Sequence, residues 1–184
     1  MKRVWILTAL GKDRPGIVAS VTRVLFQLGC NLEDSAMTRL AGEFAIMLIL
    51  AAPGRLTQER LERAFGSLAH RLTLAVHLKA LTRAELTSPQ RGKPYLLSVY
   101  GADRPGIVYR VSDLLARSGV NISDVSTHRT SPKKGKAAKP LYLMVLEVEL
   151  PTRVRASHLE TRLRRLAASL GVEASLRSAE AQVL

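Results

Sequence analysis

The chain has 184 residues, 47% of them hydrophobic, and no run of about 18 apolar residues, so no segment is expected to span a membrane. Its one cysteine, Cys30, excludes an internal disulfide, and a strand-like pattern from Val4 leaves no room for a signal sequence, so we expect a cytoplasmic protein. The formal net charge of +13 permits an acidic partner, but the basic residues are spread over both halves and aromatic residues make up only 4%. Stacking platforms for single-stranded nucleic acid are therefore scarce.

A repeated string of eight residues organises the chain. Residues 11–18 read Gly-Lys-Asp-Arg-Pro-Gly-Ile-Val and residues 101–108 read Gly-Ala-Asp-Arg-Pro-Gly-Ile-Val, a shift of 90 from 11 to 101. The same shift carries Gly29 and Asn31 onto Gly119 and Asn121. A repeat that keeps its register indicates two similar structural units. We therefore predict a first domain over residues 1–82, a linker over 83–94 and a second domain over 95–184.

The first repeat opens with an apolar strand over residues 4–10, of the kind that is buried on both faces or central in a sheet. A helix follows from Ile17, because the next apolar residues form one helical stripe, and Gly29 is placed to end it. Pro15 suits the first helical turn. Asp13 lies where a side chain can cap the free N–H groups of that helix.

A hairpin follows this helix, with strands over residues 31–40 and 44–50. Its turn is Ala41-Gly42. A second amphipathic helix is marked by Leu61, Phe65, Leu68 and Leu72, and the alternating residues 72–80 form a last strand. The resulting order, β-α-β-β-α-β, predicts an α+β, ferredoxin-like fold: a four-stranded antiparallel sheet with both helices on one face.

The second repeat takes the same course, with a strand over residues 95–100, a helix from Ile107 and a stop at Gly119. It then departs from the first, because residues 130–140 replace the tight hairpin. After them the shift between the repeats becomes 98, from Leu61 to Leu159. This lysine-rich insertion has no large apolar side chain, so we expect the loop to be mobile and solvated.

No group of residues suggests catalysis or metal binding. The four histidines are scattered, and no two have the helical spacing of a metal pair. Cys30 follows a helix end, so no positive helix start is expected to activate its thiol. We therefore expect no catalytic residue, no metal site and no cofactor.

The two strand-to-helix turns have the chemistry of a binding site. Backbone N–H groups at a helix start favour a carboxylate, and Gly16 and Gly106 let a ligand approach the main chain. Acidic side chains can accept from an ammonium group, and an amide both donates and accepts. The side chains of these kinds are Asp13, Asn31, Asp103 and Asn121. Such a set suits a zwitterion, although Asp, Pro and Gly also form a good turn without a ligand.

At these residues the sequence resembles the ACT domain, a regulatory βαββαβ module. The matching strings, Gly-x-Asp-Arg-Pro-Gly-Ile-Val and Gly-x-Asn-Leu/Ile-x-Asp, each occur twice. Residues 7–18, 29–35 and 42–44 also resemble the glycine cleavage system transcriptional repressor family. The resemblance implies that an amino acid, glycine or a similar one, binds where a turn meets a neighbouring domain. The implied ligand-binding residues are Gly11, Asp13, Arg14, Pro15, Gly16, Ile17 and Asn31, with Gly101, Asp103, Arg104, Pro105, Gly106, Ile107 and Asn121.

We therefore expect a non-enzymatic, amino-acid-sensing regulator of glycine cleavage or amino-acid metabolism. It would pair its ACT domains side by side or form a homo-oligomer, and it would act through a transcription-factor partner. Two alternatives remain open. Direct nucleic-acid binding would use the lysine-rich loop with Arg155, His158, Arg162 and Arg165, although no recognition-helix unit is evident. The other alternative is a regulatory subunit of a metabolic enzyme.

Overall fold

The computed structural model describes residues 2–86, 92–130 and 140–179, and the chain divides into two compact units, Met1–Ser88 and Pro89–Leu184. The lysine-rich loop expected over residues 130–140 falls mainly on 131–139, which lie outside the described residues. The first unit contains β1 (Lys2–Lys12), α1 (Ile17–Gln27), β2 (Asn31–Leu40), β3 (Glu43–Pro53), α2 (Gln58–Leu72), β4 (Leu74–Leu81) and α3 (Arg83–Leu86). The second contains β5 (Lys93–Ala102), α4 (Ile107–Arg117), β6 (Asn121–Thr130), β7 (Leu141–Leu150), α5 (Ala156–Leu170) and β8 (Val172–Ser178).

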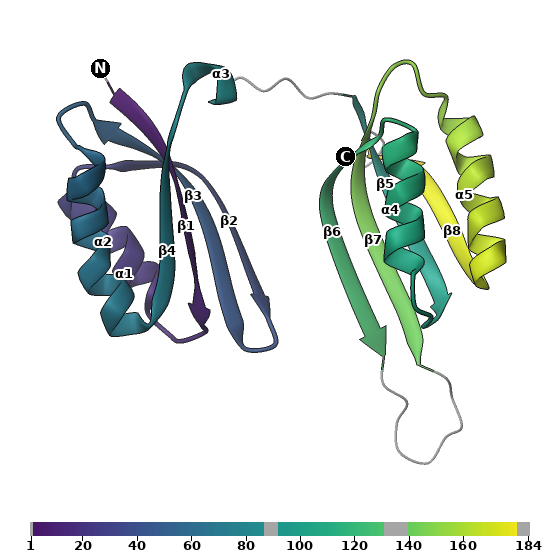
Figure 1. The fold of residues 1–184 in the computed structure, drawn as a ribbon, viewed down its shortest axis with the longest axis horizontal. Coiled ribbons are helices and arrows are strands. Elements are labelled where there is room, and N and C mark those ends of the chain that lie inside the picture. Colours follow the sequence, from purple (N-terminus) through teal and green to yellow (C-terminus); the bar gives the residue numbers. More distant parts are fainter. Residues whose placement is uncertain (1, 87–91, 131–139, 180–184) are drawn as a thin grey trace, which may run out of the picture. The chain divides into compact units, whose positions relative to one another are not determined.

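Each unit is a four-stranded sheet whose neighbouring strands are all antiparallel, in the order β2-β3-β1-β4 and β6-β7-β5-β8. The two longer helices of each unit lie on the same face of its sheet (Figure 1). The predicted fold class, two ferredoxin-like βαββαβ units, is therefore confirmed. Two strands joined by a crossover helix run in the same direction, so β1 and β2 both begin at one end of the sheet and end at the other.

The core lies between the sheet and the helices. In β1 the alternate residues Trp5, Leu7 and Ala9 are buried, and they pack with Ile17 of α1 and Phe65 of α2. The strand is central, as the apolar run predicts, but only one of its faces is covered by helices. Within the first unit, the apolar residues on the other face remain part of the surface.

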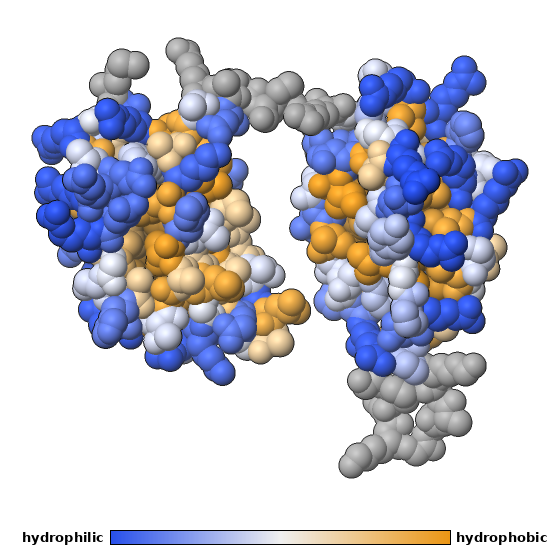
Figure 2. Space-filling view, viewed as in Figure 1, coloured by the Kyte–Doolittle hydropathy of each residue, from blue (hydrophilic) through white to orange (hydrophobic). Residues whose placement is uncertain are grey.

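The uncovered face and the outer strand of the first unit are open. Leu10 of β1 is 50% exposed and Met47 of β3 is 48% exposed. Figure 2 shows apolar side chains reaching the surface of this unit. All ten residues of β2 are exposed, and this edge strand pairs only with β3 inside the unit. An edge of this length presents unpaired N–H and C=O groups to a further strand.

The structure corrects the boundaries of the first strand and helix. β1 runs through Lys12, so Gly11 lies inside the strand rather than ending it. The helix begins at Ile17 as expected, but its N-cap is Gly16, and Pro15 precedes the helix instead of forming its first turn. Asp13 does not cap the helix, because no side-chain cap is present there.

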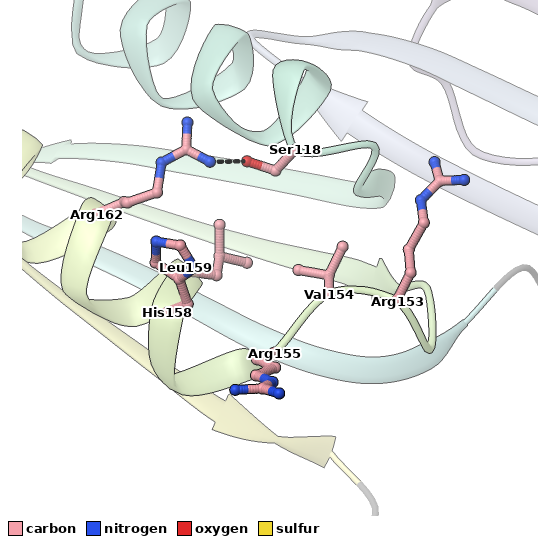
Figure 3. Close-up of a pocket in the computed structure, with 7 residues that line it drawn as sticks. All are labelled: Ser118, Arg153, Val154, Arg155, His158, Leu159 and Arg162. Atoms are coloured by element: carbon pink, nitrogen blue, oxygen red, sulfur yellow. Dashed lines mark hydrogen bonds between the residues drawn. The ribbon is translucent and has the colours of Figure 1, made fainter.

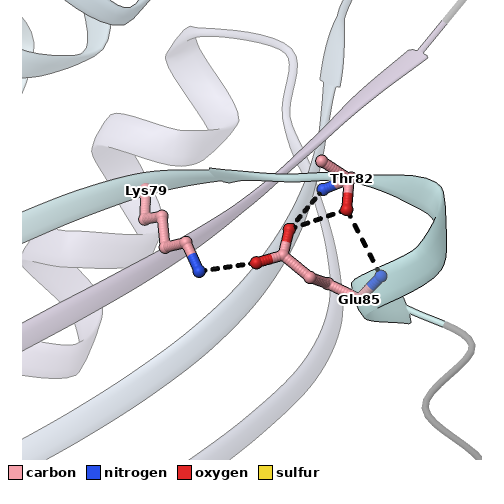
Figure 4. A network of polar contacts seen from close by, with 3 residues as sticks. All are labelled: Lys79, Thr82 and Glu85. Carbon is pink, nitrogen blue, oxygen red and sulfur yellow. Dashed lines mark hydrogen bonds and ion pairs between the residues drawn. The ribbon is translucent and has the colours of Figure 1, made fainter.

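The end of the first unit is held by a capping box. Thr82 precedes α3, and its N–H and hydroxyl each donate a hydrogen bond to the Glu85 carboxylate at 2.8 Å (Figure 4). In return, Glu85 N–H donates to the Thr82 hydroxyl at 3.4 Å. Lys79 of β4 donates to the same carboxylate at 2.6 Å. These donors lower the pKa of Glu85 to about 2, with the Lys79 hydrogen bond as the largest cause. The segment predicted as a linker, 83–94, therefore contains α3 and the start of β5.

Candidate ligand-binding turns

The two repeated turns have the same backbone. Gly16 is the N-cap of α1 with φ 90° and ψ 0°, and Gly106 is the N-cap of α4 with φ 90° and ψ −1°. Residues with a side chain rarely adopt a positive φ of this size, so the turn requires glycine. A Cβ built on either glycine would meet nothing within 4 Å. The main chain is therefore open to an approaching ligand at both turns.

Each turn presents helix N–H groups that have no acceptor inside the helix. The first backbone bond of α1 runs from Ser20 N–H to Gly16 O, at 2.9 Å, and in α4 Arg110 N–H donates to Gly106 O over the same distance. No side chain caps either helix, and neither first turn contains an acidic residue. The N–H groups before the first bond and the positive end of the helix together favour a carboxylate.

A groove of about 780 Å³ opens at the first turn. Four predicted residues line it, namely Asp13, Arg14, Gly16 and Ile17. The rest of the lining comes from Val18, Ala19 and Thr22 of α1 and from Met37, Arg39 and Phe44 of the hairpin. The groove therefore joins the start of the helix to the far end of β2, where the hairpin turns.

An arginine that the sequence analysis missed completes each turn. Arg39 Nη1 lies 3.1 Å from Asp13 Oδ2, and in the second unit Arg129 Nε lies 2.8 Å from Asp103 Oδ2. The two arginines are related by the repeat's own shift, from 39 to 129. That shift was the signal available in the sequence, although nothing local connects residue 39 to residue 13. Both carboxylates thus already have a cation beside them.

Two predicted site glycines have a packing role. A Cβ on Gly11 would lie 2.7 Å from the Thr73 carbonyl oxygen, and one on Gly101 would lie 2.8 Å from Val172 Cα. Both glycines sit in central strands where the neighbouring edge strand approaches closely. Both glycines therefore fix the strand that leads into each turn.

Arg104 also differs from its counterpart Arg14. A Cβ on Gly171 would lie 3.0 Å from Arg104 Cζ, so the guanidinium rests against the residue that ends α5. The carbonyl groups at a helix C-terminus attract a cation. Arg104 therefore contacts the end of α5, whereas Arg14 lines the groove at the first turn.

Asn31 and Asp13 lie far apart within one unit. Asn31 begins β2 and pairs with Ala51, whereas Asp13 N–H donates to Gly42 O beside the other end of that strand. Ten extended residues span about 30 Å, so the two side chains lie at opposite ends of the sheet. Asn121 likewise begins β6, where its amide donates to Glu149 at 3.3 Å.

The two turns differ at one aromatic position. Phe44 lines the first groove and is 2% exposed, and the residue in the same place of the second unit is Tyr142. The Tyr142 hydroxyl is buried without a hydrogen-bond partner among the described residues. Burial is the main cause of its raised pKa, and the negative charge of Asp103 adds to the effect. The second turn therefore contains an unsatisfied hydroxyl near its carboxylate.

Nothing at the turns resembles catalytic or metal chemistry. Burial raises the pKa of the Cys30 thiol, so this cysteine is not an activated nucleophile. Among the described residues no three His, Cys, Asp or Glu side chains form a group that could hold a metal ion. Nor does any helix in the described ranges have the length and apolarity needed to cross a membrane.

Several known proteins resemble this chain over part or most of its length. A glycine cleavage system transcriptional repressor of Escherichia coli strain K12 is 28% identical over 171 residues, covering 93% of this chain and 87% of that protein. A UPF0237 protein of Streptococcus mutans is 29% identical over 75 residues, or 41% of this chain and 85% of that protein. A crystal structure of an unknown protein from Galdieria sulphuraria superposes with a TM-score of 0.83 at 23% identity, covering 97% of this chain and 99% of that one.

The family model that matches is the ACT domain. It matches twice, over residues 3–79 and 93–177, which together include both repeated turns and every strand of both sheets except their outermost residues. The match agrees with the βαββαβ order of both units. The chain therefore belongs to the ACT domain family, with one ACT domain in each repeat.

Proposed function

We propose that this chain is a non-enzymatic regulator that senses a small amino acid, glycine or a similar one, and controls glycine cleavage or amino-acid metabolism in the cytoplasm through a protein partner. The similarity to a glycine cleavage system transcriptional repressor over 93% of the chain supports the regulatory role. The observation that carries the sensing role is the helix-start groove with its paired Arg39 and Asp13.

The groove places positive groups, the helix start and Arg39, beside the negative Asp13, which matches the two charges of a zwitterion. A ligand carboxylate would bind the free N–H groups of α1 and the guanidinium of Arg39, because the helix start carries a partial positive charge and the guanidinium a full one. The ligand ammonium would bind the Asp13 carboxylate, 3.1 Å from that guanidinium. The Arg39–Asp13 pair would then open to admit the ligand between its members. Small side chains suit a site bounded by Phe44 and Met37.

A neighbouring domain would supply the amide that one unit cannot. Antiparallel pairing of two β2 strands from two copies of the chain brings the first residue of one strand beside the last residue of the other. Asn31 would thereby reach a turn of the adjoining domain, although it lies far from its own. The fully exposed edge of β2 supports such pairing. Amino-acid binding would then bridge two domains and strengthen their association.

Ligand binding can shift this assembly only by the difference in ligand affinity between its two states, typically about 1–3 kcal/mol, or 5- to 150-fold. Such a change is enough to alter contact with a transcription factor when the paired and unpaired forms have comparable populations. The proposal therefore requires that the ligand change the association state as well as bind.

Calorimetric titration of the full chain with each common amino acid tests the proposal. We expect saturable heat with glycine or another small amino acid, and a loss of about 10-fold or more in affinity when a charged hydrogen bond is removed by Arg39→Ala or Arg129→Ala. Arg63→Ala, an exposed arginine on α2, removes the same charge away from the turn and should bind as the native chain does. No heat with any amino acid at millimolar concentration would refute the sensing role. Light scattering with and without the ligand then tests the change of association.

A further inference from the structure

A basic cavity lies in the second unit, away from the repeated turns. It has a volume of about 360 Å³ and opens between the C-terminal end of α4 and the N-terminal end of α5 (Figure 3). Its polar lining consists of Ser118, Arg153, Arg155, His158 and Arg162. Arg162 and Arg153 stand on opposite sides of the view, with His158, Val154 and Leu159 between them. Leu159 is buried in the core, and the partly exposed Val154 gives the cavity an apolar wall.

The cavity carries positive charge that the described part of the chain does not neutralise. No acidic side chain is among its lining residues. No described carboxylate lies within 4.0 Å of the side-chain nitrogens of Arg153, Arg155 or Arg162. Arg162 Nη1 instead donates to Ser118 Oγ at 2.9 Å, which directs its guanidinium across the cavity mouth. Three arginines thus contribute to the lining of one small cavity.

The start of α5 adds to the same charge. Its N-cap is Arg155, no side chain caps the helix, and its first turn has no acidic residue. The first backbone bonds of α5 run from the N–H groups of His158 and Leu159 to Arg155 O, each at 3.1 Å, so the N–H groups before them have no acceptor inside the helix. Helix start and guanidinium groups act in the same direction, because both favour an anion.

The corresponding helix start in the first unit is less basic, because Glu59 lies beside Arg60 and Arg63 in its lining. At the shift of 98 residues, Arg155 corresponds to Thr57, Ser157 to Glu59 and Arg162 to Ala64. Thr57 Oγ1 accepts from Arg60 N–H at 3.4 Å, and Glu59 adds a negative charge to the first turn of α2. The first unit thus satisfies this helix start with its own side chains. The second unit replaces both groups and gains two guanidinium groups, those of Arg155 and Arg162, in the cavity lining.

We propose that this cavity binds the phosphate group of a small phosphorylated compound. Guanidinium groups bind phosphate through two parallel N–H···O bonds, and helix starts bind the same group through backbone N–H donors. A volume of about 360 Å³ lies within the range of small-ligand sites, about 300–1,000 Å³. The partly exposed Val154 would contact the apolar part of the ligand. The amino-acid sites at the turns have no part in this inference.

A nucleic-acid backbone is the competing source of phosphate. It would need a row of cations that continues well beyond the cavity. On α5 that row reaches one turn further, to the exposed Arg165, whereas Arg164 is paired with Glu160 at 2.8 Å. A concave site with an apolar wall favours a small ligand over a duplex, which presents its phosphates on a convex surface.

Calorimetric titration of the full chain with inorganic phosphate, pyrophosphate and glycerol 3-phosphate tests the inference, with a short DNA duplex as a separate arm. We expect one saturable site per chain, and a loss of about 10-fold or more in affinity for the double variant Arg155→Ala/Arg162→Ala. Both arginines are exposed, so this variant should fold, which its thermal unfolding checks. The control Arg60→Ala/Arg63→Ala removes the same charge from α2 and should bind phosphate as the native chain does.

Three results would overturn the inference. The first is the absence of saturable binding of any phosphate compound at millimolar concentration. The second is an equal loss of affinity in both double variants, which would assign binding to the overall charge of +13. The third is binding of the duplex alone, with an affinity that falls steeply with salt, which would identify a nucleic-acid surface.

Discussion

Replacing Gly16 with alanine tests the backbone conformation that the two repeated turns have in common. Gly16 holds φ 90° and ψ 0°, a left-handed conformation that costs a residue with a Cβ roughly 1–2 kcal/mol. Nothing lies within 4 Å of a Cβ built there, so no steric clash adds to this figure. The substitution Gly16→Ala should therefore lower the free energy of unfolding of the first unit by about 1–2 kcal/mol. Gly106→Ala should do the same in the second unit, where φ is also 90°.

The matched control is Gly66→Ala in α2. A Cβ at Gly66 likewise meets nothing within 4 Å, but this glycine is exposed in the middle of a helix. Alanine there should raise the free energy of unfolding by about 0.5–1 kcal/mol. The two substitutions add the same methyl group in open space and are expected to act in opposite directions, because only the backbone conformation differs.

Differential scanning calorimetry measures both effects. For a domain of 60–100 residues, each kcal/mol shifts the unfolding temperature by about 4–8 °C. The Gly16→Ala variant should also bind an amino acid more weakly, since relaxation of the turn displaces the N–H groups of α1. If Gly16→Ala leaves the unfolding temperature of the first unit unchanged, or if Gly66→Ala lowers it as much, the assignment of the cost to the positive φ is incorrect.

Three further substitutions test individual contributions to the free energy of unfolding. Tyr142→Phe, which matches Phe44 of the first unit, should raise the free energy of unfolding of the second unit by about 1–3 kcal/mol, because it removes a buried hydroxyl with no partner among the described residues. If urea denaturation shows a lower free energy of unfolding instead, the hydroxyl has a partner. Arg39→Ala should cost only about 0.2–1 kcal/mol, because its partner Asp13 is 30% exposed and its own side chain 69% exposed; a loss of several kcal/mol would mean that the pair supports the fold. Glu85 has a folded pKa of about 2, below its usual 4.5, so its contribution is present above about pH 4.5 and is lost as the pH falls toward 2. Glu85→Gln should therefore unfold more easily than the native chain at pH 7 and equally easily near pH 2, and a constant difference across a pH series would contradict the pKa.

Several features of the fold follow from local sequence alone. The apolar stripe after Ile17 predicts a helix on one face of the sheet, and Gly29, with φ 68°, ends that helix where the sequence places a left-handed residue. The turn at Ala41 and Gly42, with φ 51° and 82°, closes the hairpin at the expected position. These predictions succeed because helix stripes, helix stops and tight turns depend on residues that are close together in the chain.

The composition of the site depended on residues that are distant in the chain. Asp13 faces Arg39 because the hairpin returns β2 to the turn, so an ion pair replaces the helix cap that local spacing suggests. Asn31 lies at the opposite end of the sheet because the crossover helix makes β1 and β2 run in the same direction. The sequence by itself determined the repeat, the element order and the glycine turns, since each is written in local pattern. Only the tertiary structure decided which charges meet, because strand direction and register set those contacts.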